Sequence, residues 1–507
     1  MSAKQQYDVV VIGAGMGGLI AGAMLAVMEG MKVLVLEKNS EIGGRVMSFG
    51  KQHGTDYSAS EMEELLYSGA WSTIVRSEPA FPKIIEKGIL KDYIIDGGWH
   101  AMSGGDRCRY ALVARALGKR LPVSNCYGMG YWQDGKWLQL PELVKGWPER
   151  SIKERARVAQ ERMLLSTEEA AEYDQISLKM YLESITDDKL VQDYYIWMGK
   201  YQTAMANPNR ISAGEWIKCN NGTAAVGRHL IAGGGMGEVT GGFKTVATTF
   251  ASIIQEHGGE VRTGQTVTEI IIEDWKAKGV VVKGKDGTEE ILASHVVCNA
   301  PIYALPKLIP EKYFPQELLQ RVKDMYPSTA ILGIMSLKEP LEKDYPTAQM
   351  EVPLLPGIEA IYPTGAEAVF GFEQVSMTDP SRAPKDRCLV EFALMTDPED
   401  VKDAQLVQKL CDLILQWFRS QYPRFDEIMD WYWFTKCDMV WGVAVTPEFT
   451  GERRFPVKHP VVRGLFFTGD DVEQWDVGSN GAAHGAVLCV SALTGRDYLK
   501  ILPPYWR

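Results

Sequence analysis

The chain has 507 residues, 46% hydrophobic and 23% charged, and its 65 Asp and Glu against 54 Lys and Arg give a net charge of −11. This apolar fraction suits two or three folded lobes and excludes disorder as the main state. A negative surface repels phosphate backbones, which argues against nucleic acid as a partner. The eight cysteines never occur as C-x-x-C and the seven histidines are scattered, so we expect neither a disulfide framework nor a bound metal.

The N-terminal segment predicts neither a signal peptide nor a membrane span. Its short polar lead runs into an apolar stretch of about five residues, which is too short for the hydrophobic region of a signal peptide. Elsewhere no run reaches the roughly 18 uncharged apolar residues that a transmembrane helix needs. We therefore expect a cytoplasmic protein, and peripheral contact with a membrane is left open.

The first forty residues carry the pattern of a dinucleotide site. Residues 7–12 read YDVVVI, which is typical of a strand buried in a parallel sheet. The glycines Gly13, Gly15 and Gly18 follow, then an apolar helical stretch and a second strand that stops at Glu37. Such glycines permit a tight turn, the approach of a pyrophosphate and close helix packing, and the terminal acid binds an adenosine ribose. The expected cofactor contacts in this block are Gly13, Ala14, Gly15, Met16, Gly17, Gly18, Glu37 and Lys38.

A second short motif identifies the kind of dinucleotide. Gly43-Gly44-Arg45 follows Glu37 closely, and the whole block resembles the FAD site of the flavin amine oxidase and phytoene desaturase superfamily. A guanidinium beside two phosphates forms charge-assisted hydrogen bonds, and paired glycines let the backbone pass close to the cofactor. The resemblance implies FAD as the cofactor, with Gly44 and Arg45 near its diphosphate.

The last fifty residues resemble the closing segment of the same superfamily. Residues 464–469 read GLFFTG, a buried strand, and Asp470 and a glycine-rich helical stretch follow. The resemblance places Asp470 near the ribityl chain or the diphosphate, and a helix opened by Gly481 toward the flavin C2 carbonyl. His484 departs from the small residue usual in relatives, so it is either a packing residue or a group near the flavin. The implied contacts are Gly469, Asp470, Gly478, Gly481 and Ala482.

A third matching element lies in the middle of the chain. The sequence predicts a turn at residues 241–242, a helix, a turn at residues 257–259, a strand ending near Val267, and an antiparallel meander. In the superfamily the backbone at the position of Val267 pairs with the adenine. The run GGGMGEV over residues 233–239 fails the dinucleotide spacing, so we expect one dinucleotide site and not two.

These motifs predict an α/β fold. A Rossmann-like FAD-binding domain, with a parallel sheet and an antiparallel meander, is joined to a discontinuous α+β substrate domain. We assign residues 1–110, 226–300 and 455–507 to the first domain, and residues 111–225 and 301–454 to the second. Residues 59–88 look like an inserted helical pair, which either shapes access to the flavin or elaborates the surface.

Aromatic residues of the substrate domain either fill its core or line a pocket for an apolar or cyclic substrate. They are Tyr194, Tyr195, Trp197, Tyr201, Trp216, Trp431, Tyr432, Trp433, Phe434 and Trp441. His100, in the stretch IIDGGWH, is the candidate catalytic polar group near the reacting centre. Trp475 is the candidate aromatic residue at the flavin edge. For both residues a purely structural role is the competing interpretation.

A flavin without a metal carries two-electron chemistry, in which a hydride leaves a substrate carbon. The superfamily includes carotenoid desaturases and isomerases, amine oxidases and protoporphyrinogen oxidases. Around Lys436 and Cys437 the sequence lacks the context of the lysine or flavin-linked cysteine of amine oxidases. We therefore expect a carbon–carbon desaturase or dehydrogenase before an amine oxidase or a double-bond isomerase.

A protein of a different class remains as a further alternative. Rab escort and GDI-type carriers of prenylated proteins resemble this fold without being oxidoreductases. The presence of Glu37, Arg45 and Asp470 argues against a carrier, because all three belong to the implied FAD site. The identity of the substrate, the electron acceptor (oxygen, a quinone or a protein) and the oligomeric state are left open.

Overall fold

A computed structural model describes residues 6–100, 102–125, 129–133, 135–227, 236–343, 349–352, 355–362 and 369–506. The β-branched run after the N-terminus forms β1 (Gln6–Ile12), the apolar stretch forms α1 (Met16–Met28), and β2 (Val33–Leu36) follows. β1 and β2 pair in parallel. The expected strand–turn–helix–strand unit is therefore present, and β2 ends just before Glu37.

A seven-stranded sheet continues from these strands, in the order β11-β2-β1-β14-β13-β12, with β20 also paired to β14. β1 and β20 run parallel to β14, while β13 runs antiparallel to both β12 and β14. The mixed α/β architecture is confirmed. The remaining strands of this sheet are β11 (Glu260–Arg262), β12 (Thr266–Glu273), β13 (Lys276–Gly284), β14 (Gly287–Cys298) and β20 (Leu465–Phe467).

The strand expected to end near Val267 is in fact two strands. β11 ends at Arg262 beside β2, and β12 begins at Thr266 and carries Val267 into the meander. Gly264 between them has a φ of 64°, a left-handed conformation that glycine adopts without a steric penalty. The expectation of one continuous strand was wrong because this turn redirects the chain to the other end of the sheet.

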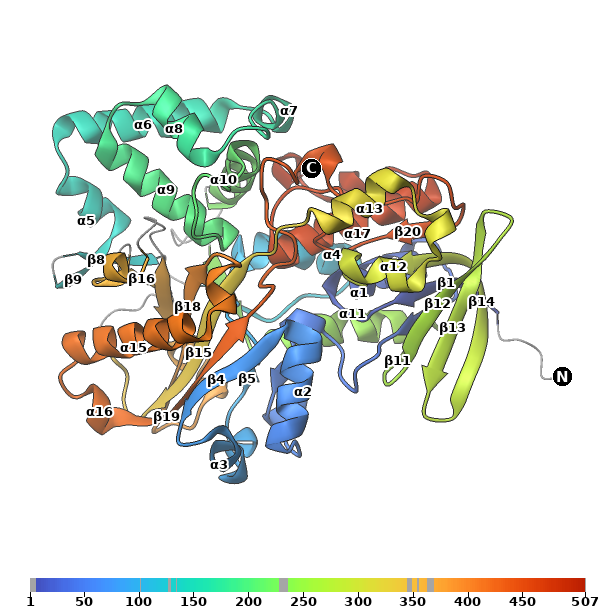
Figure 1. The fold of residues 1–507 in the computed structure, drawn as a ribbon, viewed down its shortest axis with the longest axis horizontal. Helices are drawn as coiled ribbons and strands as arrows, with labels where there is room; N and C mark the ends of the chain where they lie inside the picture. The colour runs from blue at the N-terminus through green and yellow to red at the C-terminus, as the bar shows by residue number, and fades with distance from the viewer. Residues whose placement is uncertain are drawn as a thin grey trace.

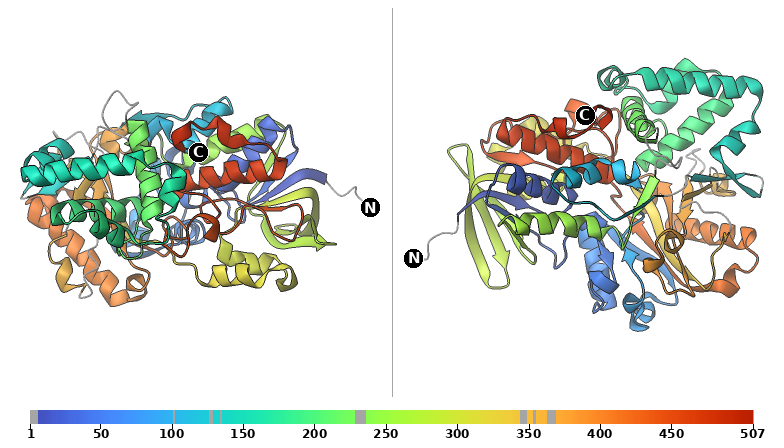
Figure 2. Two further views of the ribbon diagram at one scale, coloured as in Figure 1. Left: turned by 90° about the horizontal axis from the view of Figure 1, so that it is seen from above. Right: turned by 180° about the vertical axis from the view of Figure 1, so that it is seen from behind.

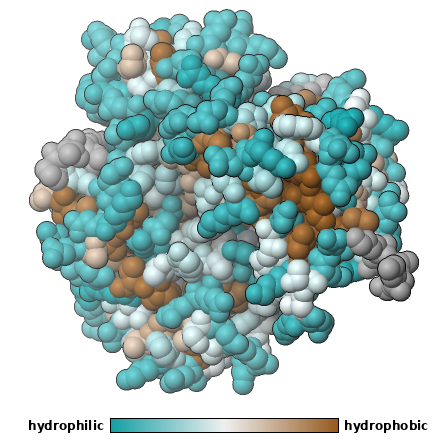
Figure 3. Space-filling model, turned by 45° about the vertical axis from the view of Figure 1, so that its right-hand side comes forward, coloured by the Kyte–Doolittle hydropathy of each residue, from teal (hydrophilic) through white to brown (hydrophobic). Residues whose placement is uncertain are grey.

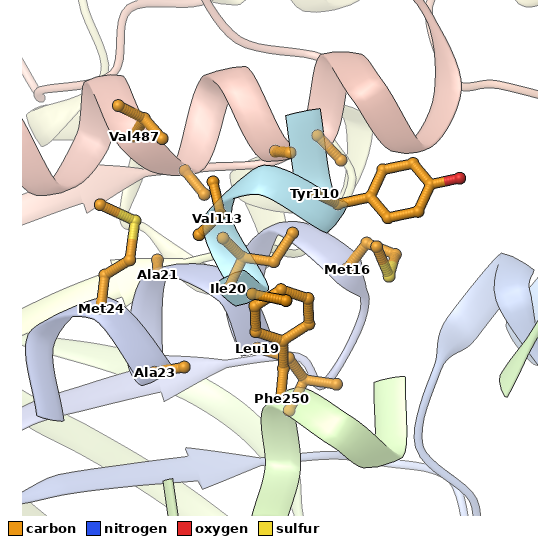
Figure 4. Close-up of a cluster of buried hydrophobic side chains, with 14 of the residues drawn as sticks. Met16, Leu19, Ile20, Ala21, Ala23, Met24, Tyr110, Val113, Phe250 and Val487 are labelled. Carbon is orange, nitrogen blue, oxygen red and sulfur yellow. The ribbon is translucent and has the colours of Figure 1, made fainter. Parts of the chain in front are cut away.

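Helix α1 lies in the centre of the larger core. It is apolar on all sides, as a fully surrounded helix must be. Figure 4 shows Leu19 and Met24 of α1 among Val113, Phe250 and Val487, which come from three other helices. Those helices are α4 (Arg109–Ala116), α11 (Lys244–Glu256) and α17 (Gly478–Thr494). The opposite face of the sheet packs on α12 (Leu305–Leu308) and α13 (Gln316–Lys323), as Figure 2 shows from above.

An eight-stranded sheet forms the second domain, beside the first (Figure 1). Its order is β4-β19-β15-β18-β17-β16-β8-β9, and α15 (Ala404–Gln421) packs its apolar side on one face. The strands are β4 (Ser72–Glu78), β8 (Met129–Gln133), β9 (Lys136–Gln139), β15 (Thr329–Leu337), β16 (Gln349–Val352), β17 (Phe370–Glu373), β18 (Cys388–Thr396) and β19 (Met429–Cys437).

Six helices form a layer at one end of this sheet, in the part of the chain expected to be helical. Tyr194, Tyr195, Trp197 and Trp216 are buried among them, so these aromatics fill the core. The four aromatics from Trp431 to Phe434 are likewise buried in β19. The helices are α5 (Leu140–Lys145), α6 (Glu149–Leu164), α7 (Thr167–Ala171), α8 (Leu178–Ile185), α9 (Lys189–Thr203) and α10 (Ala213–Gly227).

The structure differs from the expected domain boundaries at three places. Residues 59–88 form α2 (Ala59–Ala70) and α3 (Phe81–Glu86) with β4 between them, and β4 pairs with β19 of the second sheet. The expectation of a helical pair was incomplete because β4 owes its stability to a partner strand more than 350 residues away. Beyond residue 110, α4 packs in the core around α1, and beyond residue 300, α12 and α13 pack on the first sheet.

Two small sheets contain the remaining strands of the described residues. One is a pair of β3 (Ser48–Phe49) and β5 (Ile95–Asp96), and the other contains β6 (Met102–Ser103), β7 (Val123–Asn125) and β10 (Met236–Val239). The short helices α14 (Val375–Thr378) and α16 (Phe425–Ile428) complete the described part of the chain. Of the run GGGMGEV, residues 233–235 lie outside the described residues.

The surface in Figure 3 is mostly hydrophilic, with a band of hydrophobic residues in the right half of the view. Within the described ranges, no helix has the length and apolar character needed to cross a membrane.

Candidate cofactor and active site

A cavity of about 560 Å³ lies at the carboxyl ends of β1, β2, β14 and β20. Open parallel sheets bind their ligands at this edge, and the volume is that of a cofactor or ligand site. Residues from all three predicted motif blocks meet here, although the blocks are separated by more than 200 residues. The predicted site residues that line the cavity are Gly13, Gly15, Met16, Gly17, Glu37, Lys38, Gly44, Arg45, Val267, Gly469, Asp470, Gly478, Ala482 and His100.

The glycines at the start of α1 allow a very close contact between two backbone segments. A Cβ atom on Gly17 would stand 2.6 Å from the Cα of Gly469, and one on Gly15 would stand 2.8 Å from the Nδ2 of Asn299. Gly15 is the N-cap of α1 and supplies no side-chain hydrogen bond to the first turn. The N–H groups of that turn therefore face the cavity without a side-chain partner, an arrangement that binds pyrophosphate. Gly18 and Ala14 do not line the cavity, and Gly18 packs its helix on the turn at Gly13.

Glu37 is held in place by two backbone groups. Its carboxylate accepts hydrogen bonds from the N–H of Ala14 and the N–H of Asn39, both at 2.9 Å. Burial raises the pKa of Glu37, and these two N–H donors oppose the shift. Each carboxylate oxygen can accept a further hydrogen bond, and Glu37 lines the cavity. This geometry suits the binding of ribose hydroxyls.

The Gly43-Gly44-Arg45 motif forms a turn whose first two positions favour glycine. Gly43 and Gly44 have φ values of 111° and 57°, in the left-handed region that favours glycine. The turn directs Arg45 into the cavity, where its Nη1 donates to the carbonyl oxygen of Trp441. Trp441 itself lines the cavity, so among the aromatics singled out in the sequence it is a lining residue and not a core residue.

Asp470 lines the cavity and packs against Gly481 of α17. Burial raises its pKa to about 8. Gln474 donates to its carboxyl group from Nε2 at 3.3 Å. A Cβ atom on Gly481 would clash with the same carboxyl group, so Gly481 packs behind Asp470 and does not line the cavity.

Helix α17 begins at Gly478, one turn before the expected position at Gly481. The expectation was wrong because Gly478 has a φ of 60°, and this left-handed residue turns the chain into the helix beside the ring of Trp441. Gly478, Ser479 and Ala482 line the cavity. The first turn of α17 therefore faces it, as the first turn of α1 does.

His100 lines the cavity, but both of its ring nitrogens face protein. Nε2 lies 3.1 Å from the carbonyl oxygen of Arg45, and Nδ1 lies 4.0 Å from Oδ2 of Asp96. The ring stacks on Phe243, with centroids 4.6 Å apart. Burial lowers the pKa of His100, which favours the neutral imidazole with Nε2 as the donor. These contacts suit a residue that holds the Arg45 backbone in place.

Trp475 is not among the cavity-lining residues. It packs against Trp506 and against His484, whose ring centroid is 5.5 Å away. His484 is buried in α17, and burial lowers its pKa well below the usual value. Neither side chain lines the cavity, so the structure favours packing over direct contact with a cofactor.

A buried ionic cluster behind His100 is a feature that sequence reasoning missed. Arg382 contacts Asp96 at 3.2 Å, Glu238 at 3.1 Å and also Glu391. Burial raises the pKa of Glu391 to about 8 and that of Glu238 well above its usual value. The cluster joins three segments far apart in the chain, around residues 96, 238 and 382–391, so no local motif could reveal it.

A narrow crevice of about 10 Å³, room for about one water molecule, lies between the stretch at residues 95–99 and the strands β15 and β19. Its lining is largely apolar, and Asp96 and Glu391 reach it from the ionic cluster. The apolar lining residues include Phe49, Met62, Leu66, Trp99, Leu332 and Trp433.

Other residues of the cavity were also missed, and one of them had a signal in the sequence. Asn299 follows directly after β14, at the edge where ligands bind, and the polar residue after an apolar strand could have indicated it. Trp71 and Tyr303 also line the cavity, from segments without a recognisable motif, and Asp471 lines it beside the predicted Asp470. Within the described ranges, no group of three His, Cys, Asp or Glu residues could hold a metal.

Comparison with known proteins agrees with this geometry. The profile of the flavin containing amine oxidoreductase family matches residues 16–493. A protein of Danio rerio named inactive all-trans-retinol 13,14-reductase is 22% identical over 553 residues, covering 96% of this chain and 86% of that protein. A 4,4'-diapophytoene desaturase (4,4'-diapolycopene-forming) of Methylomonas sp is 35% identical over 92 residues, 17% of each chain.

A solved structure shares the fold over the whole length. An oxidoreductase from Methanosarcina mazei has a TM-score of 0.69 and 17% identity, covering 97% of this chain and 100% of that one. At this identity the likeness shows the fold alone.

Proposed function

Because the chain belongs to the family of flavin-containing amine oxidoreductases and is an FAD-dependent oxidoreductase, we propose that it transfers hydrogen at a carbon–carbon bond of an apolar substrate. The observation that carries the proposal is the match over 96% of the chain to a protein named inactive all-trans-retinol 13,14-reductase. A desaturase is a further relative, which matches at 35% identity over 92 residues. Reductases and desaturases act on the same kind of bond in opposite directions.

The residues of the cavity fit FAD. The first turn of α1 and Arg45 would hold the diphosphate, Glu37 would bind the adenosine ribose, and the start of α17 would face the flavin. Bound FAD supplies two-electron chemistry and exchanges a hydride with a substrate carbon. The fish relative is named as inactive, whereas Glu37, Arg45 and Asp470 all line the cavity here, which supports a cofactor-loaded protein.

The second domain supplies apolar surface on the substrate side. Val440 and Trp441, which follow β19, line the cavity together with Trp71 and Tyr303. Such a lining excludes water and favours a substrate without charge. We propose an apolar or cyclic small molecule as the substrate, and oxygen, a quinone or a protein as the electron acceptor.

Amine oxidation is the second candidate, since one observation favours it. Three carboxyl groups, those of Asp96, Glu238 and Glu391, surround the single guanidinium of Arg382. An excess of carboxylates behind His100, which lines the cavity, would attract the cation of an amine. The raised pKa values of Glu238 and Glu391 weaken this attraction, because protonated carboxyl groups carry no charge.

Anaerobic mixing of the FAD-loaded protein with candidate substrates tests the proposal. We expect partly saturated polyenes to bleach the visible absorbance of the flavin, or all-trans-retinol to reoxidise the chemically reduced protein. Putrescine and cyclohexylamine serve as the amine arm of the same experiment. Bleaching by amines alone would overturn the proposal in favour of amine oxidation.

A further inference from the structure

Arg109, the first residue of α4, is a fully buried cation outside the cofactor cavity. Its guanidinium carbon lies 3.7 Å from the ring centroid of Trp475 and 4.5 Å from that of Trp506. A desolvated cation over aromatic faces is held firmly by the negative potential of the rings. Burial lowers the pKa of Arg109 to about 10, so the side chain stays charged at neutral pH.

The polar contacts of Arg109 are directed at the start of α17. Its Nη1 donates to Oδ2 of Asp476 at 2.7 Å, and its backbone N–H donates to Oδ1 of Asn480 at 2.9 Å. Its Nε donates to the carbonyl oxygen of Trp506 at 3.1 Å. One residue of α4 therefore joins the residues on both sides of Gly478 to a third segment near residue 506.

Asp476 needs such support because of its backbone conformation. Its φ of 95° lies in the left-handed region, which is unfavourable for a residue other than glycine. Its N–H also donates to Oε2 of Glu215 on α10, at 3.3 Å. The surrounding contacts thus maintain a strained residue directly before the helix whose first turn faces the cavity.

We propose that Arg109 is a positioning residue for the cofactor. By fixing Asp476 and Asn480, it sets the position of the first N–H groups of α17 against the flavin end of FAD. The positive end of a helix stabilises negative charge on a reduced flavin. Arg109 therefore influences both the affinity for FAD and its reduction potential, without touching the cofactor. This inference depends on FAD binding and not on the identity of the substrate.

The experiment compares Arg109→Lys and Asp476→Asn with the unmodified full-length protein. Lysine keeps the charge but loses the planar group that contacts the rings and Asp476 together, and asparagine removes the ion pair with little change of shape. We expect the Kd for FAD to rise about tenfold, which corresponds to about 1.4 kcal/mol of lost binding energy, because the first N–H groups of α17 lose their fixed position. We also expect the reduction potential of the bound flavin to become more negative.

Arg115→Lys is the matched control, since Arg115 lies on the same helix but is exposed and pairs with Asp106 at the surface. It should change neither the Kd nor the potential. If Arg109→Lys fails to fold, Asp476→Asn supplies the same two measurements. Variants that melt at lower temperature but bind FAD with unchanged affinity and potential would refute the proposal, since they would show a structural role only.

Discussion

Glu37 offers the sharpest test of the cofactor site, through the substitution Glu37→Gln. The amide of glutamine keeps one acceptor oxygen and replaces the other with an NH₂ group. Because Ala14 and Asn39 each donate a backbone N–H to one carboxylate oxygen at 2.9 Å, one of these donors must lose its acceptor. A ribose hydroxyl would at the same time lose a charged acceptor.

The expected loss of affinity for FAD can be stated from the contacts of Glu37. The hydrogen bond lost between the charged carboxylate and a ribose hydroxyl is worth about 1.5–3 kcal/mol, which corresponds to a Kd for FAD raised about 10- to 150-fold. The unpaired N–H donor is present with and without FAD, so its cost of about 1–3 kcal/mol lowers the stability of the protein and not its affinity for FAD. The free energy of unfolding of the FAD-free protein should fall by less than this cost. Burial penalises the charged form of Glu37, and a neutral side chain removes that penalty.

Titration of the FAD-free protein with FAD, followed by quenching of flavin fluorescence, measures the effect. Glu256→Gln is the control, because Glu256 is half exposed and pairs with Lys119 on the surface, a contact worth about 0–1 kcal/mol. If Glu37→Gln binds FAD as tightly as Glu256→Gln, Glu37 does not contact the ribose and the reasoning fails.

Three further predictions concern other parts of the site. Gly17→Ala should abolish stable FAD binding, because the new Cβ would stand 2.6 Å from the Cα of Gly469. A variant that stays yellow and retains FAD after gel filtration would show that the segments of Gly17 and Gly469 are not in such close contact. Asp470→Asn should reduce the loss of stability of the FAD-free protein as the pH rises from about 4 to 8. The folded-state pKa of Asp470 is raised to about 8. Its protonated carboxyl group therefore contributes fully to the free energy of unfolding below the pKa of the unfolded chain, and this contribution is lost as the pH rises to about 8. If urea unfolding shows the same dependence of the free energy of unfolding on pH in the variant, Asp470 is not protonated. His100→Ala should lower the melting temperature but retain flavin reduction by substrate, since both ring nitrogens of His100 face protein. If the FAD-loaded variant loses flavin reduction completely, His100 has a catalytic role instead.

The sequence by itself determined the chemistry of the nucleotide end of the site. The strand, the glycines, the helix and Glu37 follow one another within forty residues, so their spacing alone fixes how they meet a pyrophosphate and a ribose. The same holds for Gly43-Gly44-Arg45, whose positive φ values require glycine. Local steric rules therefore explain why glycines stand at these positions, whereas the assignment of the motif to FAD came from the family resemblance.

Only the tertiary structure decided which distant segments complete the site. Strand β4 exists because β19 pairs with it, and the cluster around Arg382 forms only when Asp96, Glu238 and Glu391 converge. No periodicity along the chain encodes such contacts, since each partner looks like an ordinary polar or apolar residue in its own segment.

The roles of the two candidate catalytic residues depended on the tertiary structure as well. The sequence could name His100 and Trp475, but it could not tell that one lines the cavity with its nitrogens turned to protein, or that the other packs on Arg109 and does not line the cavity. The net charge of −11 describes the surface, whereas the charges that matter at this site are buried, and their pKa values depend on neighbours brought together by folding.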